Sequence, residues 1–319
     1  MVLAPTFMHI PDGFLSTLVS ILAWIFSVLV VAIALRRTGQ ELGERDVPLM
    51  GVLAAAIFAG QMLNFTVAGG TSGHLMGAAL ATILLGPWPA ILVMTAVVSV
   101  QALLFQDGGL LALGANILNM GVIGVAVSYG VFRLLKGLAH GKTWGIFGGG
   151  FLAAWFSIVI TSLAVALQLS LSGTSPANIA VPAMAGIHAL IGVGEGLITS
   201  GALTFIYASR KDLLKSDAPQ PSGNRMILIG GLAIALFLVV LAPLASANPD
   251  GLEKVAEQQG FLNTSQSPLF NIIPDYLIPG ISNQNLATIL AGILGVGIVF
   301  LAVFLFARVQ KGKNRKDKP

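Results

Sequence analysis

The sequence predicts an all-α polytopic membrane protein with about nine transmembrane helices. The 319 residues are 55% hydrophobic and only 9% charged, whereas soluble domains carry roughly 25% charge. Several apolar runs reach about 20 residues, the length of helix that crosses a bilayer core of ~30 Å. The 38 glycines agree with this class, because small residues let membrane helices approach closely.

The predicted helices follow the apolar runs along the chain. Their ranges are 17–35, 47–65, 74–86, 90–105, 110–135, 145–171, 184–207, 226–244 and 285–306. The third run is short, only about 20 Å as a helix, and Pro87-Trp88-Pro89 ends it. Residues Ser172 to Pro182 are expected to form a loop between two spans.

The distribution of basic residues predicts the orientation. Arg36 and Arg37 follow the first run, and an excess of Lys and Arg marks the cytoplasmic ends of membrane helices. With nine spans, every Lys and Arg except Lys254 falls on the cytoplasmic side. We therefore expect a multi-pass protein of the inner (plasma) membrane, with the N-terminus outside and the C-terminus in the cytoplasm. The net charge of +4 then reflects topology, and no nucleic-acid partner is expected.

Two histidines on the outer side are candidate metal ligands. If translation begins at Met8, its amine, the His9 backbone nitrogen and the His9 imidazole converge on one point and can chelate a divalent ion. Ni(II) and Cu(II) prefer square-planar nitrogen ligands. His74 follows a glycine-rich loop on the same side and is the expected fourth ligand. The chain has no cysteine, which excludes thiolate ligands.

These segments resemble the CbiM/NikM family, the substrate-binding membrane components of cobalt and nickel energy-coupling-factor transporters. The resemblance rests on MHIPDGFLS (8–16), NFTVAGGTSGHLMGAALATILLGPW (64–88), residues 107–121 and HALIGVGEGLIT (188–199). It implies a Ni²⁺ or Co²⁺ substrate held by the terminal amine, here of Met8, by the backbone nitrogen and imidazole of His9, and by His74. It also implies two kinds of partner, a transmembrane coupling (T) component and cytoplasmic ATPase subunits.

Residues 1–7 depart from the family pattern. An extension before Met8 turns the required amine into a peptide nitrogen. Three alternatives follow: Met8 is the true start, the extension is removed, or one ligand is lost.

The C-terminal third is predicted to be an accessory module. Residues 209–225 are polar and contain Pro219 and Pro221, which is typical of a linker. The linker separates a seven-helix metal-binding domain, 8–208, from a two-helix module, 226–319. Between those two helices lies Pro249-Asp250-Gly251-Leu252-Glu253, which resembles the PDGLE module of the NikN-like accessory component. This module favours nickel over cobalt.

Other polar side chains in the apolar runs and their loops are candidates for supporting the metal ligands or for coupling. They are Asn64, Ser72, Asn116, Asn119, His188 and Glu195. Interhelical hydrogen bonding is the main alternative role for the amides. Asp12 is expected to cap the start of the first helix. The glycines at 69, 70 and 73 are expected to let their loop approach the N-terminal segment.

His188 and Glu195 lie seven residues apart on one face of a predicted span. An intramembrane carboxylate is a functional candidate, and two interpretations stay open. In the first, Glu195 acts in transport, so that Glu195→Gln lowers uptake and leaves equilibrium metal binding nearly intact. In the second, a buried hydrogen-bonded His–Glu pair fixes helix packing.

The sequence therefore predicts a non-catalytic component that captures Ni²⁺ or Co²⁺ outside the cell for an ATP-driven importer. The alternative is a proton-coupled secondary carrier with His188 and Glu195 as the proton relay. A third class, a metalloenzyme that uses the histidines, lacks a general base near them.

Overall fold

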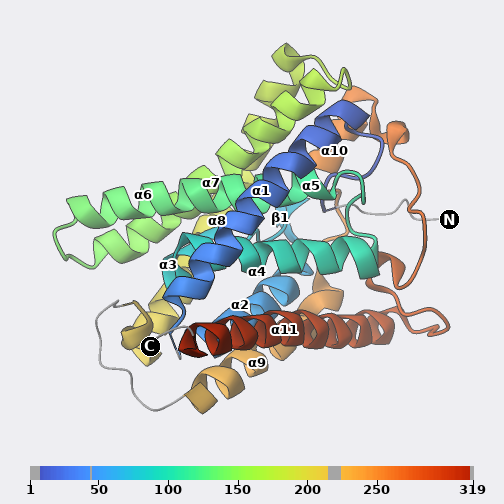
Figure 1. The fold of residues 1–319 in the computed structure, drawn as a ribbon. Coiled ribbons are helices and arrows are strands. Elements are labelled where there is room, and N and C mark those ends of the chain that lie inside the picture. The colour runs from blue at the N-terminus through green and yellow to red at the C-terminus, as the bar shows by residue number, and fades with distance from the viewer. Residues whose placement is uncertain (1–7, 44, 215–223, 317–319) are drawn as a thin grey trace.

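The computed structural model describes residues 8–43, 45–214 and 224–316, and these residues form a bundle of helices with one small β-hairpin (Figure 1). The all-α class predicted from composition is confirmed. The extension 1–7 and most of the linker 209–225 lie outside the described residues.

The regular elements follow one another along the chain with short connections. They are α1 (Thr17–Glu41), α2 (Asp46–Gln61), β1 (Phe65–Val67), β2 (Thr71–Gly73), α3 (Ala78–Leu85), α4 (Pro87–Val100), α5 (Leu113–Asn116), α6 (Gly124–Leu138), α7 (Trp144–Leu171), α8 (Ala177–Ser209), α9 (Asn224–Leu241), α10 (Gly251–Gln259) and α11 (Gln284–Lys316). The π-helical segments η1 (Gln101–Phe105) and η2 (Ile117–Ile123) continue α4 and α5, and η3 (Lys211–Leu214), η4 (Ala242–Leu244), η5 (Leu262–Thr264) and η6 (Pro274–Tyr276) are 3₁₀ turns.

Helices stand at all nine predicted positions, but two of them are too short to cross a bilayer as spans of their own. In the part of the chain that the structure describes, seven segments are long and apolar enough: Thr17–Gly39, Pro87–Phe105, Leu113–Leu138, Trp144–Leu171, Ala177–Ser209, Arg225–Leu244 and Gln284–Gly312. α2 has 16 residues and is buried along most of its length, and α3 has 8 residues. α2 ends at Gln61 because the chain then turns into the antiparallel β1–β2 hairpin, in which Phe65 pairs with Gly73.

Two prolines that were expected to interrupt helices have different effects. Gly86 has a φ of +80° and separates α3 from α4. Pro87 then occupies the first position of α4, where its fixed φ suits a helix start. Pro182 instead lies inside α8, so the loop predicted for residues 172–182 ends before Ala177. A proline near a helix start removes only one backbone hydrogen bond.

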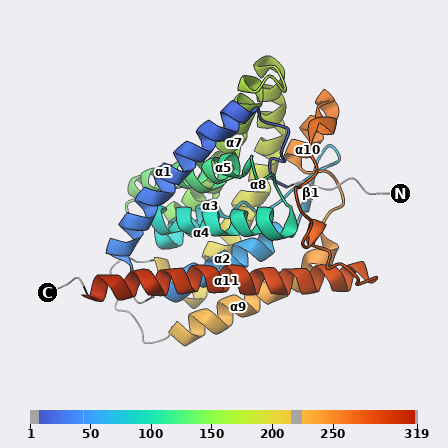
Figure 2. The ribbon, with the colours of Figure 1, turned by 45° about the vertical axis from the view of Figure 1, so that its right-hand side comes forward.

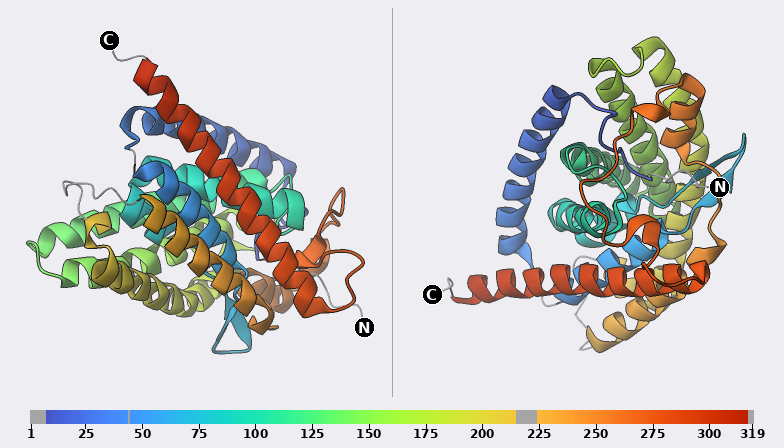
Figure 3. Two further views of the ribbon diagram at one scale, coloured as in Figure 1. Left: turned by 90° about the horizontal axis from the view of Figure 1, so that it is seen from below. Right: turned by 90° about the vertical axis from the view of Figure 1, so that its right-hand side faces the viewer.

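The two long C-terminal helices, α9 and α11, lie along α2 (Figures 2 and 3). A Cβ on Gly231 of α9 would lie 2.0 Å from Cγ1 of Val52, and Gly51 of α2 faces the ring of Phe300. Such close approach of two helices requires a residue without a side chain. Residues 226–316 therefore pack directly on the predicted metal-binding domain.

The connection between α9 and α11 crosses to the end of the molecule where the N-terminal segment lies (Figure 2). The ring of Phe261 meets the ring of Phe14 edge-on at 5.1 Å, and Leu252 joins Ile10 in the same buried apolar cluster. The Gln266 N–H donates to the Asp12 carbonyl at 2.8 Å. The C-terminal connection thus covers the segment that carries His9.

Candidate metal centre

The N-terminal segment is held inside the protein by hydrogen bonds to the loop and helix that follow η1. Asn116 binds Ile10 twice, because its Oδ1 accepts from the Ile10 N–H and its Nδ2 donates to the Ile10 carbonyl, both at 3.0 Å. The Gly109 N–H donates to the same carbonyl at 2.9 Å. His9 is consequently only 2% exposed. Asn116, a candidate supporting residue, therefore fixes the chain next to His9.

Asp12 was expected to cap the first helix, but it does not. Its carboxylate accepts the N–H groups of Leu110 and Ala112 at 3.0 and 2.9 Å, so it binds the loop ahead of α5. Ser16 caps α1 instead, with its hydroxyl oxygen 3.4 Å from the Val19 nitrogen. The carboxylate binds this loop because the segment 8–13 turns inward and brings Asp12 next to the loop, away from the start of α1.

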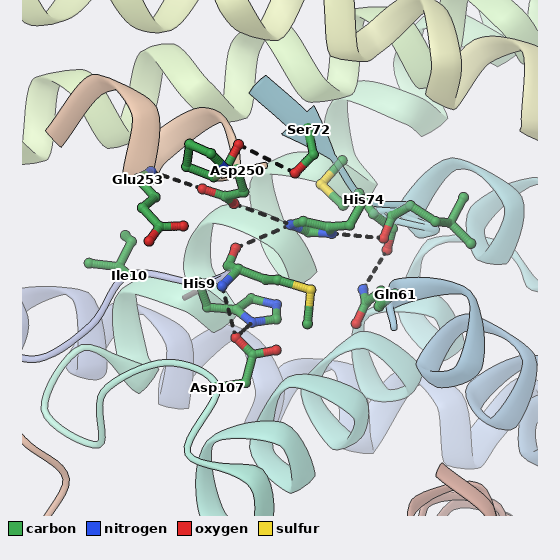
Figure 4. A network of polar contacts seen from close by, with 12 residues as sticks. His9, Ile10, Gln61, Ser72, His74, Asp107, Asp250 and Glu253 are labelled. Atoms are coloured by element: carbon green, nitrogen blue, oxygen red, sulfur yellow. Dashed lines mark hydrogen bonds and ion pairs between the residues drawn. The ribbon is translucent and has the colours of Figure 1, made fainter. Parts of the chain in front are cut away.

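Asp107 contacts two of the three nitrogens of the predicted chelate, the Met8 nitrogen and the His9 imidazole. Its Oδ1 accepts the Met8 N–H at 3.1 Å and lies 2.9 Å from His9 Nδ1. Its Oδ2 accepts the Tyr276 hydroxyl at 2.7 Å. Burial raises the pKa of Asp107, but the charge and hydrogen bond of His9, together with Tyr276, outweigh burial and the net pKa is lowered. Met8 N and His9 Nδ1 thus converge on one atom (Figure 4).

His74 faces the N-terminal segment from the other side. Its Nδ1 lies 3.1 Å from the Leu75 carbonyl, and its Nε2 lies 3.1 Å from the Met8 carbonyl and 3.9 Å from Asp250 Oδ2. The rings of His74 and His9 are 5.6 Å apart. Burial, followed by the charge of His9, lowers the pKa of His74. A neutral ring that donates from Nδ1 presents its Nε2 lone pair to two oxygens, an arrangement that a cation stabilises.

Gly108 is the glycine that lets the chain approach His9. It has a φ of +99°, and a Cβ there would lie 2.9 Å from Cβ of His9. The glycines predicted for this role lie elsewhere. Gly69 and Gly70 form the turn of the hairpin, with no atom within 4 Å of an added Cβ, and Gly73 packs against Ile191. That part of the prediction is wrong, because neither the turn at Gly69 and Gly70 nor Gly73 has the N-terminal segment against it.

Three other supporting candidates are placed by their hydrogen bonds. Ser72 donates to the Asn248 carbonyl at 2.8 Å and so ties β2 to the PDGLE segment. Asn119, in η2, exchanges two hydrogen bonds with Gln168 of α7, at 2.8 and 2.7 Å, which is the interhelical role. The Asn64 carbonyl accepts from the Ser246 N–H at 2.8 Å. Ser72 and Asn64 thus contact the C-terminal connection, whereas the His74 ring nitrogens contact the Leu75 and Met8 carbonyls.

His188 and Glu195 do not bind each other within the described residues. His188 Nδ1 lies 2.8 Å from the Met184 carbonyl of its own helix. Glu195 is fully buried and accepts the N–H groups of Met76 and Gly77 at 2.8 and 2.9 Å. The predicted His–Glu pair is therefore not formed. Glu195 instead holds the residues that follow His74 at the start of α3.

A cavity of about 80 Å³ adjoins both histidines. Its wall includes His9, His74, His188, Asn119 and Asp250, together with methionines of the N-terminal segment, the hairpin exit, η2 and α8. Imidazole binds nickel and other transition metals, and thioether groups are soft ligands for metals such as Cu(I). Among the described residues, no three His, Cys, Asp or Glu side chains form a group of the kind that holds a metal ion by side chains alone.

Residues 9–213 match the family described as the cobalt uptake substrate-specific transmembrane region, CbiM. The chain belongs to this family. Residues 225–312 match the PDGLE domain, so the resemblance drawn from both sets of motifs is confirmed.

Individual relatives extend the match over most of the chain. A relative from Archaeoglobus fulgidus, provisionally named fused nickel transport protein NikMN, is 34% identical over 95% of this chain and 99% of its own length. A provisionally named metal transport protein of Haloquadratum walsbyi is 45% identical over 65% of this chain and 93% of its own length. The crystal structure of a truncated transition metal transporter is similar with a TM-score of 0.56, at 34% identity, and the match covers 63% of this chain and 99% of that chain.

Three residues of this site were not predicted: Asp107, Asp250 and Tyr276. Asp107 and Asp250 both lie in polar stretches that the charge distribution places outside, on the same side as the two histidines. That shared side was a usable signal for the two carboxylates. No pattern in the sequence points to Tyr276, which reaches Asp107 only through the packing of η6 against η1.

Proposed function

We propose that this protein is the substrate-capture component of an ATP-driven energy-coupling-factor importer for Ni²⁺ or Co²⁺. The observation that carries the proposal is the convergence of Met8 N and His9 Nδ1 on a single atom, Asp107 Oδ1, beside His74. A small cation bound by these nitrogens would replace one carboxylate oxygen as their common partner.

The chemistry of the proposed ligands selects the ion. An α-amine has a pKa of roughly 7.7 to 8.0 and loses its proton readily near neutral pH, whereas the His9 amide releases its proton only to a bound metal. Nitrogen ligands in a plane suit Ni²⁺. The proposal requires a free amine at Met8, and therefore a chain that begins there or is processed there.

The names of the relatives support both candidate ions. The family description names cobalt, and the fused relative that spans almost the whole chain is named for nickel. That relative includes the C-terminal part in its match, which favours nickel for this protein.

The energy for transport is proposed to come from other subunits, a transmembrane coupling component and cytoplasmic ATPases. Membership of the family supports this assignment. The proposed orientation places the N-terminus and the metal centre outside and the C-terminus in the cytoplasm of a cell with this protein in its inner membrane. The protein itself performs no covalent chemistry in this proposal.

Metal binding by purified protein tests the capture site. A chain that begins at Met8 should bind Ni²⁺ stoichiometrically, show the optical spectrum of a planar four-nitrogen complex, and release protons on binding. Binding should disappear in His9→Ala and His74→Ala and persist in His140→Ala, because His140 is exposed in the loop after α6.

A residue inserted between Met8 and His9 enlarges the chelate ring and should abolish tight binding as fully as His74→Ala does. A form that retains residues 1–7 should bind weakly. Stoichiometric binding by that extended form, with the planar four-nitrogen spectrum, would overturn the role of the amine.

The proton-coupled carrier remains the competing function, and vesicle transport distinguishes the two. The hydrogen bonds of His188 and Glu195 to separate backbone groups argue against a relay between them. Nickel uptake that requires the ATPase subunits and ATP hydrolysis supports the proposal. Uptake driven by a proton gradient alone supports the carrier.

A further inference from the structure

The C-terminal connection contacts the two candidate ligand histidines from two separate points. Asp250 Oδ2 lies 3.9 Å from His74 Nε2. Tyr276 donates to the second oxygen of Asp107, whose first oxygen contacts His9. Figure 4 shows Asp250 and Asp107 on opposite sides of the paired histidines. The C-terminal part therefore contributes directly to the surroundings of both rings.

The backbone ahead of Asp250 is fixed to the strand that leads to His74. The Pro249 carbonyl accepts the Ser72 N–H at 2.8 Å and the Thr71 hydroxyl at 3.0 Å. These bonds join the PDGLE segment to β2, two residues before His74. The position of Asp250 relative to His74 is consequently set by backbone contacts as well as by the side chains.

The two oxygens of Asp250 have different surroundings. Oδ1 accepts the Glu253 N–H at 2.9 Å and caps α10, a common role for Asp. Oδ2 faces His74 at a distance longer than a hydrogen bond. The side chain is 7% exposed, and a buried carboxylate is stable only beside hydrogen-bond donors or positive charge.

The residue after Asp250 has to be small for this approach. A Cβ on Gly251 would lie 2.8 Å from Cε1 and 2.9 Å from Nε2 of His188. α10 therefore begins directly on the imidazole of His188, in the wall of the cavity. Glycine at this position lets the N-terminus of α10, with its capping carboxylate, reach the cavity.

Within the described residues, Asp250 is the only carboxylate in the lining of the cavity. The lining also contains the three histidines His9, His74 and His188, and the neutral polar side chains of Asn116, Asn119, Thr161 and Ser162. Nickel and cobalt arrive as hydrated dications. A carboxyl group in a cleft with low-dielectric walls binds such a cation as it gives up its proton, which raises the association rate.

We propose that Asp250 is a transient ligand for the transported cation, which it takes on arrival beside His74 and passes to the four nitrogen ligands. This inference rests on the proposed function and adds the residue through which the C-terminal part acts on the metal. The PDGLE segment then contributes a side chain to the binding site, in addition to covering it.

The test is Asp250→Asn in the chain that begins at Met8 and keeps its whole C-terminal part. Asn caps helices as well as Asp does, so the substitution removes the charge and keeps the cap on α10. The matched control is Glu257→Gln on the same helix, because the Glu257 side chain is 41% exposed and lies 3.6 Å from the ammonium group of Lys254, outside the cavity lining. Ni²⁺ association is followed by stopped flow, and the equilibrium affinity by calorimetry.

We expect Asp250→Asn to bind Ni²⁺ roughly tenfold more slowly than the parent chain, and more weakly at equilibrium, while Glu257→Gln stays within about twofold of the parent. Asp250→Ser, which also caps, should repeat the Asn result if the parental thermal stability is kept. Parental rate and affinity in both Asp250 variants would overturn the proposal. If the unmodified chain binds no Ni²⁺, the proposed function fails instead.

Discussion

Glu195 binds the backbone of Gly77 across the interior of the protein, with its Oε1 2.9 Å from the Gly77 nitrogen. Gly77 precedes the first residue of α3 and has a φ of +81°. The carboxylate therefore caps α3 from α8, in place of the side-chain cap that Gly77 cannot provide. Because His74 lies just ahead of this cap, α8 is connected to the candidate metal ligand through one buried side chain.

Glu195→Gln should weaken metal binding and uptake together. The amide keeps one acceptor oxygen but turns its NH₂ group toward a backbone N–H, and a buried donor left without an acceptor costs about 1–3 kcal/mol. This revises the expectation drawn from the sequence, in which binding stays nearly intact. Calorimetry and vesicle uptake are measured in parallel, with Ser200→Ala as the control, because Ser200 bonds the Phe147 carbonyl of α7 instead of α3. Reduced uptake with parental affinity would return Glu195 to a role in transport.

Tyr276→Phe should lower metal affinity without unfolding the protein. The phenylalanine ring preserves the stacking on Phe105, at a centroid distance of 4.7 Å, and removes only the hydroxyl that binds Asp107 at 2.7 Å. Groups that form hydrogen bonds to the residues around a metal, and so orient its ligands, typically contribute roughly tenfold or more to metal affinity. Tyr207→Phe, on α8 away from the site, is the control. Equal Ni²⁺ affinity in the parent and in Tyr276→Phe would show that Asp107 needs no support from the C-terminal connection.

Gly108→Ala should abolish metal binding, whereas Gly173→Ala should only reduce stability. Both glycines have positive φ, +99° and +75°, so alanine is strained at either position, by roughly 1 kcal/mol or more. Only at Gly108 does the new methyl meet His9, 2.9 Å away, while an added Cβ at Gly173 has open space. Thermal unfolding in detergent measures the shared strain, and Ni²⁺ titration measures the difference. Similar Ni²⁺ affinities in the two variants would contradict the close approach of Gly108 to His9.

The stability of the protein should decrease as the pH rises from about 4.5 to about 7 because of Glu253. Burial raises the pKa of Glu253 from 4.5 to about 7. The unfolded chain therefore releases this proton at lower pH than the folded chain does. The contribution of Glu253 to the free energy of unfolding is therefore fully present below the unfolded pKa. It is lost as the pH rises from the unfolded pKa to the folded pKa. The full difference corresponds to about 3 kcal/mol, and solvent screening around the partly enclosed carboxyl reduces the loss below that value.

Glu253→Gln should flatten this part of the profile of thermal unfolding against pH and stabilise the protein at pH 8. Glu253 is only 6% exposed as a whole residue. Glu257 on the same helix serves as the comparison. Its charge adds to the raised pKa of Glu253 less than burial does, so Glu257→Gln should flatten the profile only slightly. A parental profile in Glu253→Gln would show that this carboxylate is solvated.

The sequence by itself determined the class of the protein, its family and the two histidines. Apolar runs of membrane length predict helices because each run must leave water as a unit. Basic residues mark one side of the membrane, so His9 and His74 were expected on the same face before any contact was known. These signals are local, since each depends on the composition of one segment.

The tertiary structure alone decided which polar groups meet. Asp107 binds His9, and Asp250 faces His74 although the two lie far apart in the sequence. The packing of α10 on α8 sets the second of these contacts. Glu195 was noticed as an intramembrane carboxylate, but its partner, the backbone at Gly77, was not. Hydropathy predicts whether a side chain is buried. It does not predict which distant group will form the hydrogen bond that a buried oxygen requires. That choice is made when the helices pack.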